Sequence, residues 1–136
     1  MVEFKEGEFS FKYPSSWKET NGSDIDHPGA KFYDNNANAI IEYYNVSSEF
    51  STVKEITEQR ITYAQSQGDS IELVETVTLD GRNASNIILE NADGDYTRYV
   101  SMFSDGKLYV FKITGDSVNT VTADDIQQTI NSADIA

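Results

Sequence analysis

Residues 9–17 read FSFKYPSSW, and this stretch decides how the fold is expected to begin. Every second residue from Phe9 to Tyr13 is aromatic, which places three rings on one face of an extended strand. Pro14 has no N–H to give to a neighbouring strand, so it should end the pairing. We expect this segment to be the opening strand of the fold, with Trp17, the only tryptophan, turning back over its edge.

Three Asp-Gly pairs recur further along the chain, at spacings of 13 and 12 residues. Asp-Gly is favoured where a hairpin needs positive φ. The runs between the pairs are rich in Ile, Val, Leu, Tyr and Phe, as strands are. We therefore predict an antiparallel meander whose strands lie near residues 71–79, 83–90, 96–103 and 108–114. Two shorter strands are predicted at residues 31–34 and 39–46.

The hydrophobic period changes to that of a helix over residues 51–68. Thr52 with Glu55 fits a capping box, and Gly68 is a plausible C-terminal stop. A second helix is predicted over residues 123–132 with Thr122 as its N-cap. The last two residues, 135–136, look like a fraying tail.

The strand at residues 108–111 is apolar on both faces, so the sheet that contains it should be covered on both sides. The predicted helices are the elements that can supply this cover. We expect an α+β fold, an antiparallel β-sheet meander with helices on both faces, in one domain that spans residues 1–136.

Composition limits the function. The chain has 136 residues and a formal net charge of −13, which repels a phosphate backbone, so we expect no nucleic-acid partner. It contains no cysteine, which excludes a disulfide, a thiolate nucleophile and a Cys-based metal site. No segment approaches about 20 consecutive apolar residues, and residues 1–15 carry charges where a signal peptide needs an apolar run.

His27 is the only histidine, and it lies in the segment DIDHP of residues 24–28. Asp24 or Asp26 together with this imidazole would hold a divalent metal if other parts of the chain supplied further ligands. The alternative is a plain polar loop, which is common in a chain with 23 acidic residues. No serine or threonine stands in a recognisable nucleophile motif, so we expect no catalytic residues and no enzyme activity.

Three weaker signals leave alternatives open. Residues 91–95 (NADGD) faintly resemble a calcium loop, but they lack the downstream Glu of that pattern, and their position between two strands is explained by turn chemistry without calcium. Arg60 falls near the apolar stripe of the first helix, where it would reach an anionic ligand or lay its stem along the surface. Three Asn-X-Ser sequons, which matter only in an exported chain, begin at Asn21, Asn45 and Asn83.

Four segments together resemble the PsbP-like family in order and spacing over nearly the whole chain. Residues 9–17 are similar to the family's opening strand, which is followed by proline and tryptophan. The central hairpin glycine, the late strand and the closing helix of the family are similar to residues 79–84, 106–111 and 126–132.

The resemblance implies an antiparallel sheet between helices and a role in binding or assembly without catalysis. It implies an extracytoplasmic accessory domain, lipoprotein-like, tethered by an N-terminal segment that precedes this sequence and acting on an unidentified protein partner. A cytoplasmic location stays open, and we expect a monomer with no cofactor. The alternative function is a small-molecule or divalent-metal-binding protein, which predicts a pocket joining His27 to acids, or Arg60 to a cavity between helix and sheet.

Overall fold

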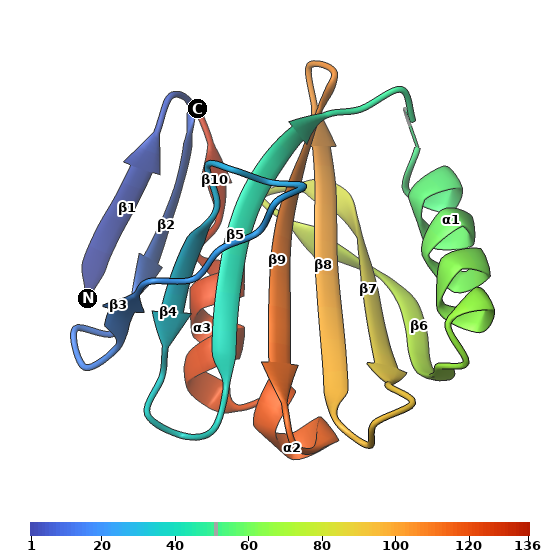
Figure 1. Ribbon diagram of the computed structural model, residues 1–136. Coiled ribbons are helices and arrows are strands. Elements are labelled where there is room, and N and C mark those ends of the chain that lie inside the picture. Colours follow the sequence, from blue (N-terminus) through green and yellow to red (C-terminus); the bar gives the residue numbers. More distant parts are fainter. Residues whose placement is uncertain (51) are drawn as a thin grey trace.

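The computed structural model describes residues 1–50 and 52–136. Its centre is a seven-stranded antiparallel sheet (Figure 1). In spatial order the strands are β3 (Lys18–Thr20), β4 (Lys31–Asp34), β5 (Ile40–Ser47), β9 (Lys107–Gly115), β8 (Tyr96–Ser104), β7 (Arg82–Glu90) and β6 (Ser70–Leu79). The predicted meander is confirmed, since β6 to β9 pair antiparallel in sequence order.

The hairpin turns account for the regular spacing of the Asp-Gly pairs. Asp80 and Asp105 have φ of 51° and 49°, and each is followed by a glycine that also has positive φ. This pair of left-handed residues matches the twist of the flanking strands. At the third turn only Gly94 has positive φ, and a longer loop is closed by the bond from Asn91 N–H to Asp95 O (2.7 Å).

A second, three-stranded sheet contains the aromatic segment of residues 9–13. Strand β2 (Phe9–Tyr13) is its centre, between β1 (Val2–Glu6) and β10 (Asp134–Ile135). The expectation that residues 9–13 open the fold was wrong, because β1 precedes them and pairs along their whole length. The prediction that residues 135–136 form a fraying tail was also wrong, because Ile135 is buried and Ala136 N–H donates to Glu8 O (2.8 Å).

The first predicted helix is confirmed as α1 (Val53–Ser66). The Thr52 hydroxyl accepts a bond from Glu55 N–H at 3.2 Å, as the capping box requires. Gly68 follows the helix with φ of 78°, a conformation that glycine adopts without a Cβ penalty. Among the described residues, no helix is long and apolar enough to cross a bilayer.

The C-terminal helical region differs in detail from the prediction. It is split into α2 (Val118–Val121) and α3 (Asp124–Asn131). Thr122 was predicted as an N-cap, and this was wrong: it closes α2, where its hydroxyl donates to Val118 O (2.8 Å). The residue before α3 is Ala123, which has no side-chain acceptor to offer.

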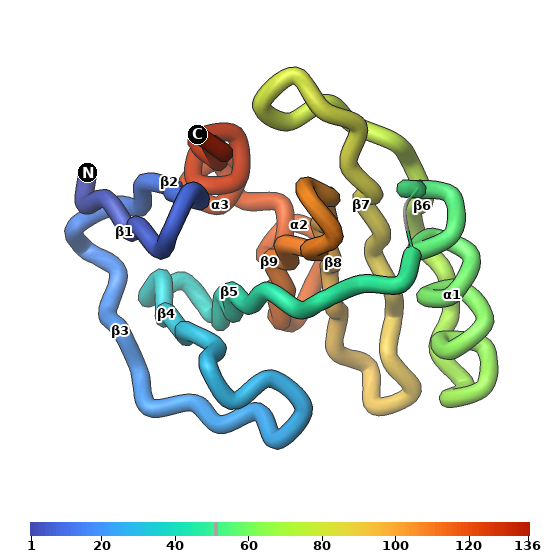
Figure 2. Tube along the Cα trace, turned by 90° about the horizontal axis from the view of Figure 1, so that it is seen from above, coloured from blue at the N-terminus to red at the C-terminus, as the bar shows by residue number. Residues whose placement is uncertain are grey.

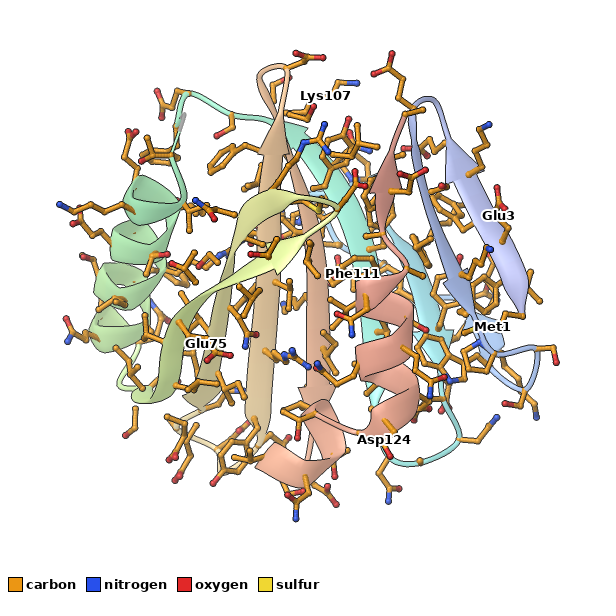
Figure 3. All side chains as sticks on the ribbon, turned by 180° about the vertical axis from the view of Figure 1, so that it is seen from behind. Met1, Glu3, Glu75, Lys107, Phe111 and Asp124 are labelled. Carbon is orange, nitrogen blue, oxygen red and sulfur yellow. The ribbon has the colours of Figure 1, made fainter. Side chains whose placement is uncertain are left out.

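The two faces of the central sheet are covered differently. One face, here called the core face, packs against α2, α3 and the three-stranded sheet through the main hydrophobic cluster. Figure 3 looks onto this side of the molecule, with Phe111 labelled in the core. The opposite face, here called the loop face, carries α1 over β6 to β8 and the connection between β3 and β4. The predicted cover of helices on both faces is confirmed.

Arg98 is a buried charge on the core face that ties α2 to the sheet. Its Nε donates to Asn86 Oδ1 (2.9 Å), and a terminal nitrogen donates to Val121 O (3.1 Å). Asn86 in turn donates to Glu75 Oε1 at 2.8 Å. Each of these bonds satisfies a group that would otherwise be costly to bury.

Candidate functional site

The connection between β3 and β4, residues 21–30, is here called the site loop. It lies on the opposite side of the central sheet from α2 and α3 (Figure 2). Asp24 organises it: its Oδ1 accepts from Asp26 N–H (3.0 Å), and its carbonyl accepts from His27 N–H (3.2 Å). The His27 carbonyl then accepts from Ala30 N–H (3.0 Å). These local bonds bring the Asp24 and His27 side chains to the same side of the loop.

The His27 ring is fixed by two contacts. It stacks on Tyr44 of β5, with ring centroids 3.7 Å apart and planes inclined by 12°. Its Nδ1 lies 2.8 Å from Asp24 Oδ2. A stacked imidazole with one nitrogen directed at a carboxylate has little freedom to turn.

Glu42 completes the group from the sheet beneath. Its neighbours in β5 alternate between the faces, so Glu42 and Tyr44 both point to the loop face, and Glu42 is only 5% exposed. One ligand atom each from Asp24, His27 and Glu42 lies within 4.8 Å of the others. Within the described part of the chain, no donor group faces the buried Glu42 Oε2, so the ionised carboxylate has no hydrogen bond there.

The two carboxyl groups have opposite pKa shifts because they share one small volume. Burial, followed by the hydrogen bond and negative charge of Asp24, raises the pKa of Glu42 to about 7. The hydrogen bond from Glu42, opposed by burial and helped by His27, lowers the pKa of Asp24 to about 2. One proton therefore stays on Glu42 and bridges the pair over most of the acidic range.

The acids also line a cavity of about 390 Å³ on the loop face. Its other lining residues include Phe32, Lys112 and the exposed Ile25 at the tip of the site loop. Lys112 is the direct cross-strand partner of Glu42 in the pairing of β5 with β9. The cavity thus joins the buried Glu42 and the partly exposed Asp24 to one ammonium group.

This donor set suits a divalent cation. One imidazole nitrogen and two carboxylate oxygens are ligands of Zn²⁺ and Mn²⁺. Tetrahedral ligands about 2.0–2.2 Å from a zinc ion lie about 3.4 Å apart. The ligand atoms of Asp24, His27 and Glu42 lie within 4.8 Å of one another, so the three side chains would have to move closer together to bind a zinc ion. A cation would replace the shared proton and would give Glu42 Oε2 a partner.

Gly22 holds the site loop close to the sheet. A Cβ at this position would collide with the ring of Phe32, whereas a Cβ at Gly29 would meet nothing within 4 Å. We expect Gly22→Ala to displace the loop and to weaken cation binding by about tenfold, the scale of changes that disturb ligand orientation. Isothermal titration with Zn²⁺ checks this, with Gly29→Ala as the matched control. Equal affinities in the two variants would contradict this account of the loop.

The other candidates from the sequence lie apart from this group. Asp26 is exposed and contributes only its backbone N–H to Asp24. The guanidinium of Arg60 stacks on Tyr99, with 4.2 Å from its carbon to the ring centroid, and it donates to Ser101 Oγ (3.0 Å). The pocket predicted to join His27 to acids is present only in part. Asp24 and Glu42 line the cavity, whereas His27 lies beside Asp24 and is not among the described residues that line it.

The loop of residues 91–95 follows the hairpin interpretation. Asp93 accepts from Asp95 N–H (2.9 Å), and the Asn91 side chain donates to Thr97 (2.7 Å). These bonds close the turn between β7 and β8. Among the three sequons, Asn45 is engaged by Glu6 (2.8 Å), while Asn21 and Asn83 are exposed. Their use stays a prediction.

Glu42 was not among the site residues predicted from the sequence. It is 15 residues from His27, and only strand pairing brings the two together. A signal was present, since Glu42 is the one charged residue within the run Ile40 to Tyr44, which is otherwise apolar or aromatic on both faces. A charge in a strand that is buried on both sides is rarely there without a partner.

No protein-family profile and no curated protein matches the chain. Solved structures do match. The solution structure of cyanobacterial PsbP (CyanoP) from Synechocystis sp. PCC 6803 aligns with a TM-score of 0.70 and 12% identity, over 99% of this chain and 92% of that one. LpqN of Mycobacterium tuberculosis, described as involved in cell envelope biogenesis, aligns with a TM-score of 0.55 and 15% identity, over 93% and 83% of the two chains.

A protein from Bacteroides thetaiotaomicron aligns with a TM-score of 0.67 and 13% identity over 98% of this chain. The chain spans about half of that protein, 48% of its length. The PsbP-like fold expected from the sequence is therefore confirmed, including its antiparallel sheets and few helices. A shared fold does not establish a shared function, so the function is inferred from the residues of the site.

Proposed function

We propose that this chain is a non-catalytic accessory domain that binds a divalent cation through Asp24, His27 and Glu42. The observation that carries the proposal is the buried, unpartnered oxygen of Glu42, which lies in a group whose ligand atoms fall within 4.8 Å of each other. Buried polar atoms in folded proteins are nearly always satisfied. A proton shared with Asp24 satisfies this oxygen below the pKa of Glu42, and above that pKa a cation held between the three side chains would do so.

The two carboxylates explain why a cation is the favoured occupant. When both are ionised, they repel each other at short range, and a proton or a metal ion removes the repulsion. Zn²⁺ and Mn²⁺ accept this mixture of imidazole and carboxylate, whereas Mg²⁺ and Ca²⁺ prefer oxygen ligands alone. We therefore expect Zn²⁺ or Mn²⁺ to bind more tightly than Ca²⁺.

The accessory role rests on the kind of protein that shares the fold. The matched structures include a PsbP and an envelope-biogenesis protein, which supports a binding role outside the cytoplasm. We place this chain there as well, acting on a protein partner. Ile25, 97% exposed on the rim of the cavity, is the apolar contact that the site loop offers to such a partner.

Thermal unfolding of the chelator-treated protein tests the cation site. At a free Zn²⁺ concentration 100 times Kd, we expect Tm to rise by about 8–12 °C, by mass action on the folded state. His27→Ala should remove most of this rise. Because the chain has one histidine, ¹⁵N NMR reports a single imidazole, whose Nδ1 resonance should move on metal binding. A Tm rise that persists in His27→Ala, with an unmoved imidazole signal, would place the metal elsewhere.

A further inference from the structure

Lys112 is a charged side chain that the cation site does not use as a ligand. It projects from β9 to the loop face and is half-buried. Its ammonium lies 5.9 Å from the Tyr99 ring centroid, and it lines the same cavity as Asp24 and Glu42. Among the described residues, no carboxylate oxygen lies within the 4 Å of an ion pair from it. Its positive charge acts on Glu42, its cross-strand partner, but no contact ion pair among the described residues holds it in place.

Once a divalent metal is bound, the charges around the cavity leave one positive charge without a negative partner. Asp24 and Glu42 neutralise a divalent cation, and His27 binds metals as the neutral ring. The charge of Lys112 is then left uncompensated beside the metal. The combination attracts an anion, although the chain as a whole carries −13, because distant surface charges are screened within about 8 Å at physiological salt.

The coordination number of the metal also indicates that the loaded cavity can bind an anion. Three protein ligands leave at least one position open on a tetrahedral zinc ion, and more on a six-coordinate ion. The acids that would hold the metal line a cavity of about 390 Å³, at the lower end of the range for small-molecule sites. A ligand in this cavity can therefore contact the metal and the Lys112 ammonium together.

We infer that the metal-loaded site takes a small oxyanion, a carboxylate or a phosphate, with one oxygen on the cation and another accepting from Lys112. This inference rests on the cation site proposed above. A free, small anion is favoured over an anionic membrane surface, because the net charge of −13 opposes approach to an extended negative surface. In this account Lys112 is a specificity residue: it selects an anionic ligand over water.

Mn²⁺ and inorganic phosphate provide the test, on the chelator-treated full chain. The EPR signal of free Mn²⁺ falls as the ion binds, and bound Mn²⁺ broadens the ³¹P resonance of phosphate that coordinates it. We expect wild type and Lys112→Met to bind Mn²⁺ equally well, while Lys112→Met loses about tenfold or more in phosphate affinity, the scale of one charge-assisted hydrogen bond. Lys112→Arg should retain phosphate. Lys107→Met, at the exposed end of the same strand, should behave as wild type.

The outcomes separate the two proposals. Failure of the wild type to bind Mn²⁺ or Zn²⁺ would remove the cation site and the inference with it. Tight metal binding with identical phosphate broadening in wild type and Lys112→Met would overturn the inference alone. Acetate that displaces phosphate from the wild type would support a general oxyanion site. Binding of the loaded protein to phosphatidic acid vesicles without any response to inorganic phosphate would replace the small anion with a lipid headgroup, and so overturn it.

Discussion

Replacing Glu42 by glutamine is expected to lower cation affinity by at least about 100-fold, beyond the losses typical of groups that only orient a ligand. The amide has the size of the acid but carries no charge to offer the metal. In metal-free protein the same substitution should stabilise the fold by about 1–2 kcal/mol, because the amide donates to Asp24 without a proton from solvent. Zinc titration calorimetry and urea unfolding in chelator measure the two effects.

The pH dependence of stability provides a further readout on the same variant. The folded state raises the pKa of Glu42 from 4.5 to about 7, so the folded protein holds a proton that the unfolded chain releases. The unfolding free energy of metal-free wild type should therefore fall as pH rises from about 4.5 to 7, by on the order of 2–3 kcal/mol. Glu42→Gln should lack this decline.

Glu3→Gln is the matched control, since Glu3 is exposed on β1 (Figure 3). It should leave metal affinity, stability and pH dependence unchanged. A Glu42→Gln protein that binds Zn²⁺ as tightly as wild type would remove Glu42 from the site. A variant less stable than wild type at pH 8 in chelator would show that the buried carboxylate is already satisfied.

Replacing Phe11 by alanine is expected to destabilise the protein by about 3–5 kcal/mol, the range for truncating a buried aromatic residue. Phe11 is 1% exposed and lies where the three-stranded sheet meets the central sheet. Its ring contacts those of Tyr43 and Phe111, with centroids 5.5 and 5.1 Å away, and that of Phe4 at 4.9 Å. Truncation of the Phe11 ring to alanine therefore removes packing that joins the two sheets.

Urea unfolding measures this effect, and Tyr63→Ala is its control, because Tyr63 is an aromatic residue 66% exposed on α1. The control should stay within about 0.5 kcal/mol of wild type. A loss below about 1 kcal/mol in Phe11→Ala would mean that the two sheets do not share one core. Cation affinity should survive in folded Phe11→Ala, because the site lies on the opposite face of the central sheet.

The sequence predicted the meander well because its signals are local. An Asp-Gly pair between alternating runs defines a hairpin whatever lies elsewhere, and each predicted strand boundary lies within one residue of the observed one. The capping of α1 by Thr52 depends on Glu55 three residues away. Such features need no knowledge of the tertiary structure.

The failures involve elements that exist only through long-range pairing. Strand β1 is almost entirely exposed, and β10 has two residues, so neither carries a strand pattern of its own. Both form because β2 offers an edge on each side. Thr122 was assigned to the wrong helix because only Thr122 and Ala123 separate α2 from α3. A break this short is not revealed by the hydrophobic period.

The candidate site also contains residues that are close in the sequence and residues that only strand pairing brings together. Asp24 and His27 are three residues apart, and a turn joins them, so the sequence could nominate them together. Glu42 and Lys112 come from strands that are far apart in the chain, and only the pairing of β5 with β9 makes them neighbours. The orientation that puts both on the loop face follows from strand register, which the sequence pattern alone did not specify.

An anomalous difference map from a crystal soaked in Zn²⁺ tests the central claim most directly. The account predicts one strong peak within about 2.0–2.2 Å of Asp24, of Glu42 and of a ring nitrogen of His27. Density for a further ligand should extend from the metal toward Lys112. Zinc bound only at surface carboxylates, with the Asp24, His27 and Glu42 side chains unchanged, would contradict the cation site and the function proposed from it.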